Sequence, residues 1–411
     1  MNTEEMSENE IEDLKRQLKQ MEESMLRQQA QIEALKKRID SLPVKEEVKQ
    51  EVESYLSSNE AREKKDPDPS AVTLAYTPDD DKYSLSLKTA DNKYSLHFGA
   101  RLQFQYTFRD RDREKDTSTL EVRRARVYFG GNIYGKLLHY YVSLDADRAR
   151  DVNLRDFYVY WTPQKELNAK IGYFIVPFNR HRVTSSSKLL LIDRAIASEF
   201  FDQDRDYGLN IYGLPFNGHV EYHAAVFTGA GETANVNIDN KLMYVLSVRY
   251  NPFGKFDYYS DTDLAHSGTL KATMGAAVVF NPKLRDKPSE EAGTAGVFDF
   301  GLRYKGIAWE NEYYIMSHDH DGGGSIKSEG FFTQLGYFVL PKKLELAARY
   351  SLLDPDKDTS RDLHREYTIG LNYYFRKHRS KIQSDFSHFV TDAGEQTKHE
   401  NIFRIQYQII F

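Results

Sequence analysis

The feature that most constrains this sequence is a strict two-residue alternation of apolar and polar side chains. In residues 94–109, the even positions are aromatic or aliphatic, and the odd positions are Ser, His, Gly, Arg, Gln or Thr. Neighbouring side chains of a β-strand point to opposite faces, so this segment would have one apolar and one polar face. It is longer than the usual strand of about 5–6 residues. Such a length is typical of a tilted strand that crosses a membrane.

The alternation recurs as far as the end of the chain, in about sixteen segments that include residues 140–147, 242–250, 270–280, 344–352 and 403–411. Short turns alternate with longer polar loops, which is typical of outer-membrane barrels. One connection, residues 251–268, is long where the order predicts a short turn. The sequence predicts an all-β transmembrane barrel of about sixteen antiparallel strands over residues 93–411. The alternative, a soluble sandwich or propeller, would need a second protein layer to cover every apolar face.

Composition agrees with a membrane barrel. The chain has 28 Tyr and 24 Phe but only 2 Trp, and its mean hydropathy is −0.66. A barrel combines a wet lumen with aromatic girdles at the membrane interfaces. No run of residues is long and apolar enough for a transmembrane helix. Residues 1–10 are acidic and lack the apolar core of a signal peptide, so we expect that a signal has already been removed.

A different period governs the N-terminal region. Between residues 11 and 42 the repeat is three or four residues, which predicts a coiled coil over residues 1–42. Its core positions are Ile11, Leu14, Leu18, Met21, Met25, Gln28, Ile32, Leu35, Ile39 and Leu42. The alternative is a single amphipathic helix that lies on another domain. Pro43 ends this helix, and residues 43–92 are predicted to be a linker with a short helix. The net charge of −6 resides in residues 1–70, so the barrel is formally neutral.

Four blocks of the barrel region resemble the phosphate-selective porin O/P family: residues 121–145, 171–180, 189–213 and 248–254. The chain also ends in Phe411 after an alternating strand, as barrels recognised by the outer-membrane assembly machinery tend to. The resemblance implies a homotrimer in the bacterial outer membrane, in contact with its lipid and lipopolysaccharide. It further implies an inward loop, at about residues 177–206, that narrows each pore. The basic residues expected at this constriction are Arg180, Arg182, Lys188 and Arg194.

The alternation also predicts which charged side chains face the lumen. The basic ones are Arg101, Arg124, Arg126, Lys170, Arg249, Lys271, Arg303, Arg349 and Arg404. The acidic ones are Asp145, Asp147, Asp156, Glu221, Asp299, Glu310, Glu312 and Glu345. Arg124 and Arg126 either form an anion ladder or pair with Asp145 or Asp147 on the next strand, and the two interpretations can coexist. Arg123 is expected to point away from the lumen.

Two groups of residues have some features of a metal site. One is residues 318–321, which a following run of glycines marks as a solvated loop. The other is His219, Glu221 and His223, which are better explained as polar pore lining. The sequence has no phosphate-binding glycine loop, no GxSxG motif and no basic stripe with interleaved aromatics. It therefore predicts no enzymatic activity, no bound metal or cofactor, and no nucleic-acid binding.

The predicted function is passive diffusion of small hydrophilic solutes, neutral or anionic, with a bias toward anions such as phosphate. Because the strand number is even, the first strand begins and the last strand ends on the same side of the membrane. The coiled coil is therefore expected in the periplasm. The alternative is a structural protein whose coiled coil tethers the outer membrane to peptidoglycan or to a periplasmic protein.

Overall fold

The computed structural model describes residue 54 and residues 71–77, 82–147, 151–231, 237, 240–257, 259–282, 293–319 and 324–411. The predicted coiled coil lies outside these residues. So does the predicted short helix, apart from Ser54. In the described part of the chain, no helix combines the length and the apolar character needed to cross a membrane.

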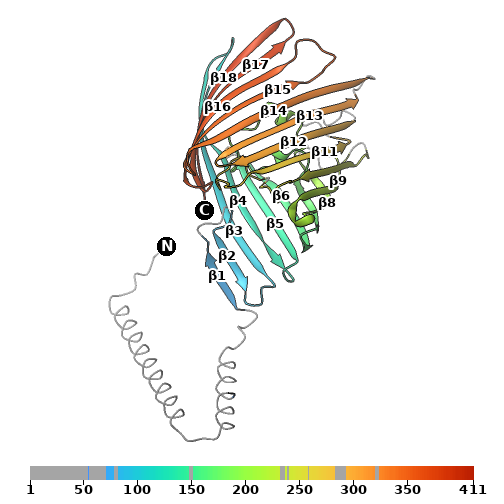
Figure 1. Ribbon diagram of the computed structural model, residues 1–411, viewed down its shortest axis with the longest axis vertical. Coiled ribbons are helices and arrows are strands. Elements are labelled where there is room, and N and C mark those ends of the chain that lie inside the picture. The colour runs from blue at the N-terminus through green and yellow to red at the C-terminus, as the bar shows by residue number, and fades with distance from the viewer. Residues whose placement is uncertain are drawn as a thin grey trace, which may run out of the picture. The chain divides into compact units, whose positions relative to one another are not determined.

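Sixteen antiparallel strands, β3–β18, form a closed barrel (Figure 1). Each strand pairs with the next in the chain, and β18 closes the barrel by pairing with β3. This confirms the predicted fold. The strands are β3 (Ser95–Arg111), β4 (Thr117–Ile133), β5 (Leu138–Asp147), β6 (Asp151–Gln164), β7 (Leu167–Ile175), β8 (Arg205–Gly213), β9 (Val220–Phe227), β10 (Met243–Tyr250), β11 (Lys271–Phe280), β12 (Thr294–Tyr304), β13 (Ile307–Asp319), β14 (Ser325–Leu340), β15 (Leu344–Asp354), β16 (His364–Arg376), β17 (Ser380–Ala393) and β18 (Gln396–Ile410).

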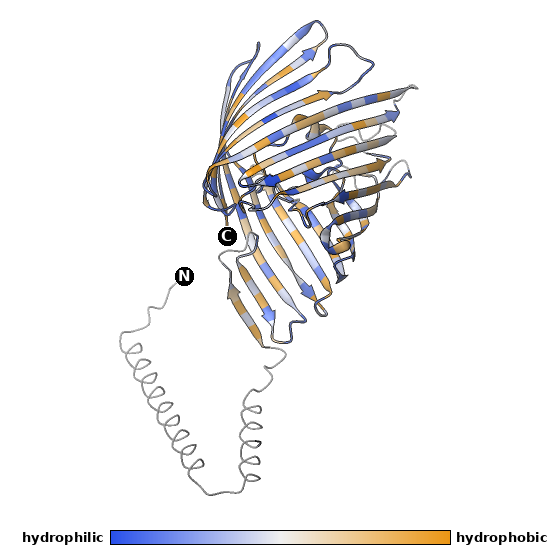
Figure 2. Ribbon diagram, in the orientation of Figure 1, coloured by the Kyte–Doolittle hydropathy of each residue, from blue (hydrophilic) through white to orange (hydrophobic). Residues whose placement is uncertain are grey.

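The barrel carries its apolar side chains outside and its polar side chains inside. Along β3, Arg101, Gln103 and Gln105 are buried, whereas Phe104 and Tyr106 are 42% and 37% exposed. The alternating colours of the strands in Figure 2 show the same pattern around the wall. An apolar exterior of this kind needs a lipid environment, because soluble proteins rarely expose large contiguous apolar surfaces.

The two ends of the barrel differ in the length of their connections. At one end, called here the turn end, short turns follow β4, β6, β8, β12, β14 and β16. At the other, the loop end, the longest connection is residues 176–204, between β7 and β8. Two connections depart from the expected lengths. Only Gly394 and Glu395 separate β17 from β18, although this connection lies at the loop end, where longer loops are expected. The long connection after β10, residues 251–270, lies at the turn end.

Two further strands extend the wall at the turn end. They are β1 (Val72–Tyr76) and β2 (Leu85–Thr89), and they form an antiparallel pair within the region predicted as a linker. β2 pairs with the first residues of β3, beyond the point where β18 ends (Figure 1). Gly99 lies beneath the connection between β1 and β2. A Cβ atom at Gly99 would come within 1.9 Å of the Lys82 carbonyl oxygen, so only glycine fits there.

Candidate functional site

The connection between β7 and β8, residues 176–204, folds into the barrel and is called here the inward loop. It contains two short helices, α3 (Arg180–Val183) and α4 (Ile196–Phe200). Its apolar residues Phe178, Ala195 and Ala197 are fully buried. They join a cluster with wall residues such as Val245 and Tyr314. The loop therefore folds inward, as the family resemblance implied, and fills the side of the lumen that faces β9–β15.

Polar wall residues fasten the inward loop along its length. The Arg180 guanidinium donates to Glu310 at 2.9 Å and lies 3.7 Å from Asp299. Backbone N–H groups of the loop donate to three further wall carboxylates: His181 to Glu312, Ile192 to Asp385 and Ile196 to Glu366, at 2.6, 3.0 and 3.0 Å. Buried backbone donors must be paired, and these carboxylates supply the acceptors that secondary structure does not.

The long connection at the turn end, residues 251–270, contacts the inward loop from that end of the barrel. Asp261 is fully buried, and its backbone N–H donates to the Lys188 carbonyl at 3.0 Å. Its carboxylate accepts from the Leu190 N–H at 3.3 Å and lies 3.4 Å from the His181 imidazole. The unexpected length of this connection thus has a structural reason, because it reaches the inward loop inside the barrel.

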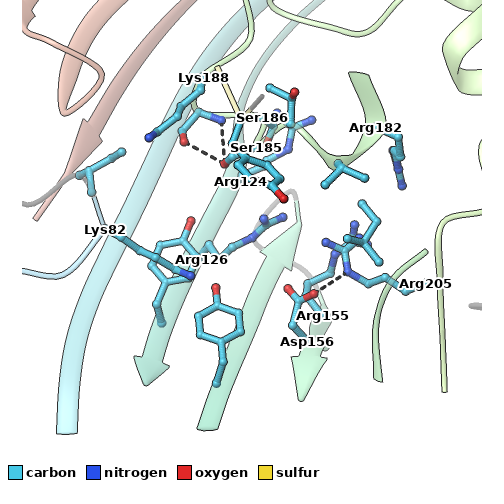
Figure 3. A pocket seen from close by; sticks show the side chains of 18 of the residues that line it. Lys82, Arg124, Arg126, Arg155, Asp156, Arg182, Ser185, Ser186, Lys188 and Arg205 are labelled. Carbon is cyan, nitrogen blue, oxygen red and sulfur yellow. Dashed lines mark hydrogen bonds and ion pairs between the residues drawn. The ribbon is translucent and has the colours of Figure 1, made fainter. Parts of the chain in front are cut away.

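Open space remains between the inward loop and strands β4–β6, in two adjoining cavities of ≈ 340 Å³ each. Both cavities are lined by the same five arginines, which we call the arginine neck: Arg124, Arg126, Arg155, Arg182 and Arg194. On the loop-end side the neck opens toward Asn153 and Asp193. On the turn-end side it opens toward Tyr128, Tyr141, Tyr158 and Lys82. Figure 3 shows four of the neck arginines, with Lys82 and Lys188 across the same space.

Two β-bulges change which arginines line these cavities. In the pairing of β3 with β4, Gln103 faces Arg124 and Phe104 faces Val122, so Arg123 is an extra residue. In the pairing of β5 with β6, Arg155 is skipped in the same way. A bulge breaks the two-residue alternation and redirects a side chain. Arg123 therefore lines the loop-end cavity, contrary to the prediction that it points outward, and Arg155 joins the neck.

The neck arginines differ in how far their charge is compensated. Arg126 pairs with Asp145, with Nε and Oδ2 3.1 Å apart. Arg182 pairs with Asp202 and Asp204, and its Nη1 lies 3.6 Å from Glu199. Arg126 thus has a carboxylate partner on the next strand, as one of the two interpretations predicted, whereas Arg124 has none among the described residues.

Arg124 and Arg194 make no ion pair within the described ranges. Arg124 donates to the Gln103 side-chain oxygen at 3.1 Å. Arg194 donates to the backbone carbonyls of His181 and Thr184 at 2.9 and 2.6 Å. These neutral hydrogen-bond partners hold each guanidinium in place without a direct ion pair.

Charge is unevenly distributed inside the barrel. Among the described residues that line the two cavities, nine are basic and four are acidic. One of the acids, Asp193, is bound by Arg404 at 2.6 Å. Burial raises the pKa of its carboxyl, but Arg404, Arg123 and Arg124 outweigh burial and keep that pKa below its usual range. Many of the remaining wall acids hold the inward loop or pair with arginines on the filled side. The formally neutral barrel thus has a positive open path.

Other residues predicted at the pore have different surroundings. Arg180 faces the filled side and lines neither cavity, because Glu310 and Asp299 hold it there. Lys188 lines the turn-end cavity. Four of the predicted wall arginines make ion pairs: Arg249 with Asp299, Arg303 with Glu310, Arg349 with Glu366 and Arg404 with Asp385. Arg101 donates to the hydroxyls of Ser185 and Ser186, and Lys271 donates to the Phe253 carbonyl. The Lys170 ammonium lies 4.8 Å from the centroids of the Tyr158 and Phe174 rings.

The residues weighed as metal ligands do not converge. His223 lies 3.2 Å from Glu221 and 3.1 Å from Asn210, whereas His219 contacts the Asn251 carbonyl. No group of three potential ligands occurs among the residues that the structure describes. His320 and Asp321 lie outside them.

Comparisons with known proteins agree with this architecture. The chain is 25% identical, over 78% of its length and 87% of the relative, to an uncharacterized protein of Aquifex aeolicus (strain VF5). An anion-selective porin from Comamonas acidovorans matches with a TM-score of 0.54 and 13% identity, over 77% of this chain and all of that one. OmpT of Vibrio cholerae, in its trimer form, matches with a TM-score of 0.53 and 12% identity, over 77% and 99% of the two chains.

The channel DcaP of Acinetobacter baumannii matches with a TM-score of 0.52 and 11% identity, over 77% of this chain and 97% of that one. At such identities the three structural matches show the fold alone. The family model of the phosphate-selective porins O and P matches residues 96–411, which is the barrel from β3 to the last residue. With its inward loop and its polar lumen, this outer-membrane channel belongs to the phosphate-selective porin O and P family.

Proposed function

We propose that the channel favours anions and that the arginine neck selects them. The observation that carries this proposal is the excess of basic over acidic side chains around the two cavities, nine against four among the described lining residues. We expect Arg124 and Arg194 to contribute most, because neither makes a direct ion pair with a carboxylate among the described residues. The resemblance to a porin that is itself anion-selective supports the same conclusion.

The physical basis is local. Two unit charges 4 Å apart interact by about 1 kcal/mol in bulk water and by about 4 kcal/mol at the lower effective dielectric of a protein surface. Charges that line the narrow path between the inward loop and the wall therefore act on a permeating ion more strongly than charges at the wide ends of the barrel. Guanidinium groups also bind phosphate and carboxylate oxygens in a fork geometry, which suits small oxyanions such as phosphate.

The test is the zero-current potential of the purified protein in a planar bilayer, across a KCl gradient. We expect the sign that corresponds to chloride permeation, and a smaller potential at high salt, because the Debye length falls to ~3 Å at 1 M. Added phosphate should reduce the chloride conductance if it occupies the neck. A potential of the sign for potassium permeation would refute the proposal.

We also propose a homotrimer with its N-terminal arm in the periplasm. The heptads of residues 11–42 favour self-association. β1 begins at the turn end, and short turns are periplasmic in outer-membrane barrels, so the arm would start on the periplasmic side. OmpT of Vibrio cholerae, which has the same fold, has a trimer form.

A second function, tethering of the outer membrane through the arm, rests on the same heptads. Deletion of residues 1–70 separates the two functions. A tether predicts a cell-envelope defect with unchanged single-channel conductance, whereas a purely assembling arm predicts loss of the trimer. A deletion variant that keeps both the trimer and a normal envelope would contradict both roles.

A further inference from the structure

An apolar groove of ≈ 790 Å³ lies on the outer wall, over strands β10–β14. Most of its lining side chains are those that the alternation turns outward, among them Leu246 and Val248 of β10, Phe298 of β12, and Tyr313 and Ile315 of β13. Their exposed fractions range from 39% to 57%. The groove is thus on the lipid side of the barrel and is separate from the pore.

Two small residues create the groove. Ala276 of β11 is paired with Val248 and Phe298, and Gly296 of β12 is paired with Val278 and Ile315. Each small residue is therefore flanked by larger outward side chains on the neighbouring strands. A furrow bordered by branched and aromatic side chains fits an unbranched hydrocarbon chain, which gains dispersion contacts along both sides.

The end of the groove nearest the loop end is polar and basic. Thr294, Ser317 and Lys327 occupy successive paired positions on β12, β13 and β14. Lys357, from the loop after β15, pairs with Glu329 and also lines the groove. Within the described residues, the Lys327 ammonium makes no hydrogen bond or ion pair. Two lysines and two hydroxyls against one carboxylate make this end suitable for a phosphate group.

We propose that this groove binds lipopolysaccharide, with one acyl chain of the lipid lying over Ala276 and Gly296 and a phosphate of its sugar headgroup on Lys327 and Lys357. The orientation of the groove in the membrane supports the assignment to lipopolysaccharide. Its basic end lies at the loop end, which faces the cell exterior in outer-membrane barrels and hence the outer leaflet. A phosphate and an acyl chain on one molecule satisfy both ends of the groove together.

The test measures binding of bisphosphorylated lipid A to the delipidated porin in detergent by native mass spectrometry. Ala276→Phe fills the groove, and each displaced methylene should weaken binding about fourfold. Ala348→Phe is the matched control, because Ala348 is an outward alanine on β15, away from the groove. Similar lipid A binding by these two variants would overturn the proposal.

The headgroup contact has its own variants. Lys327→Gln and Lys357→Gln should each weaken lipid A binding by about fivefold, and dephosphorylated lipid A should bind them and the wild type equally. Lys398→Gln, an exposed lysine of β18, is the control and should bind normally. Phosphatidylglycerol binding as tightly as lipid A would refute the assignment to lipopolysaccharide. Single-channel conductance should not change in any of these variants, so the outcome is independent of the proposed anion selectivity.

Discussion

Substitution of Arg124 by glutamine removes one charge from the arginine neck with little change of shape. Arg124 lines both cavities and has only a neutral hydrogen-bond partner, Gln103, in the described residues. A permeating anion in contact with Arg124 would therefore lose its attraction to a full charge. At about 4 Å this attraction is at least ~1 kcal/mol. We expect the chloride-to-potassium permeability ratio to fall at least fivefold, since ~1.4 kcal/mol corresponds to tenfold.

The assay is the zero-current potential across a KCl gradient, measured for the wild type, Arg124→Gln and Arg124→Lys. The lysine variant keeps the charge and should keep most of the selectivity. Lys305→Gln is the matched control, because Lys305 lies in a turn at the end of the barrel, outside both cavities. Equal potentials for the wild type and Arg124→Gln would refute the argument that the Arg124 guanidinium selects anions.

Three further predictions concern the architecture. Arg180→Met leaves only Arg303 and Arg249 to balance the buried carboxylates of Glu310, Asp299 and Glu312, at a cost of about 3–5 kcal/mol; trypsin should then cut the inward loop, and an uncut loop with unchanged melting would count against its anchoring role. Gly99→Val would meet the Lys82 carbonyl, so we expect proteolysis between β1 and β2 while the barrel stays intact; resistance equal to the wild type would contradict the close approach. Ile369→Arg places a charge on the lipid face, where Ile369 is 64% exposed; unfolding in lipid should need about 2–4 kcal/mol less free energy if the site is near the midplane, and an unchanged free energy would argue against a lipid-facing position.

The strands and their faces could be predicted from the sequence because both depend on local rules. Alternation places every second side chain on one face, and this is sufficient to turn Arg101, Arg249 and Arg303 inward and Phe104 and Ile405 outward. The alternation of short turns with longer loops, which the sequence predicted, also appears in most of the connections. The family resemblance predicted the inward loop at about residues 177–206, and the structure has this loop between β7 and β8.

The composition of the neck was decided by tertiary structure. The bulges at Arg123 and Arg155 depend on how two strands pair, and a single strand carries no sign of them. The same holds for Arg180, whose contacts with Glu310 and Asp299 join residues more than a hundred positions apart. Alternation predicts which face a charge occupies, but only the closed barrel brings each charge to its partner. The positive path through a neutral barrel arises from this pairing, because the acids that hold the inward loop are removed from the open side of the lumen.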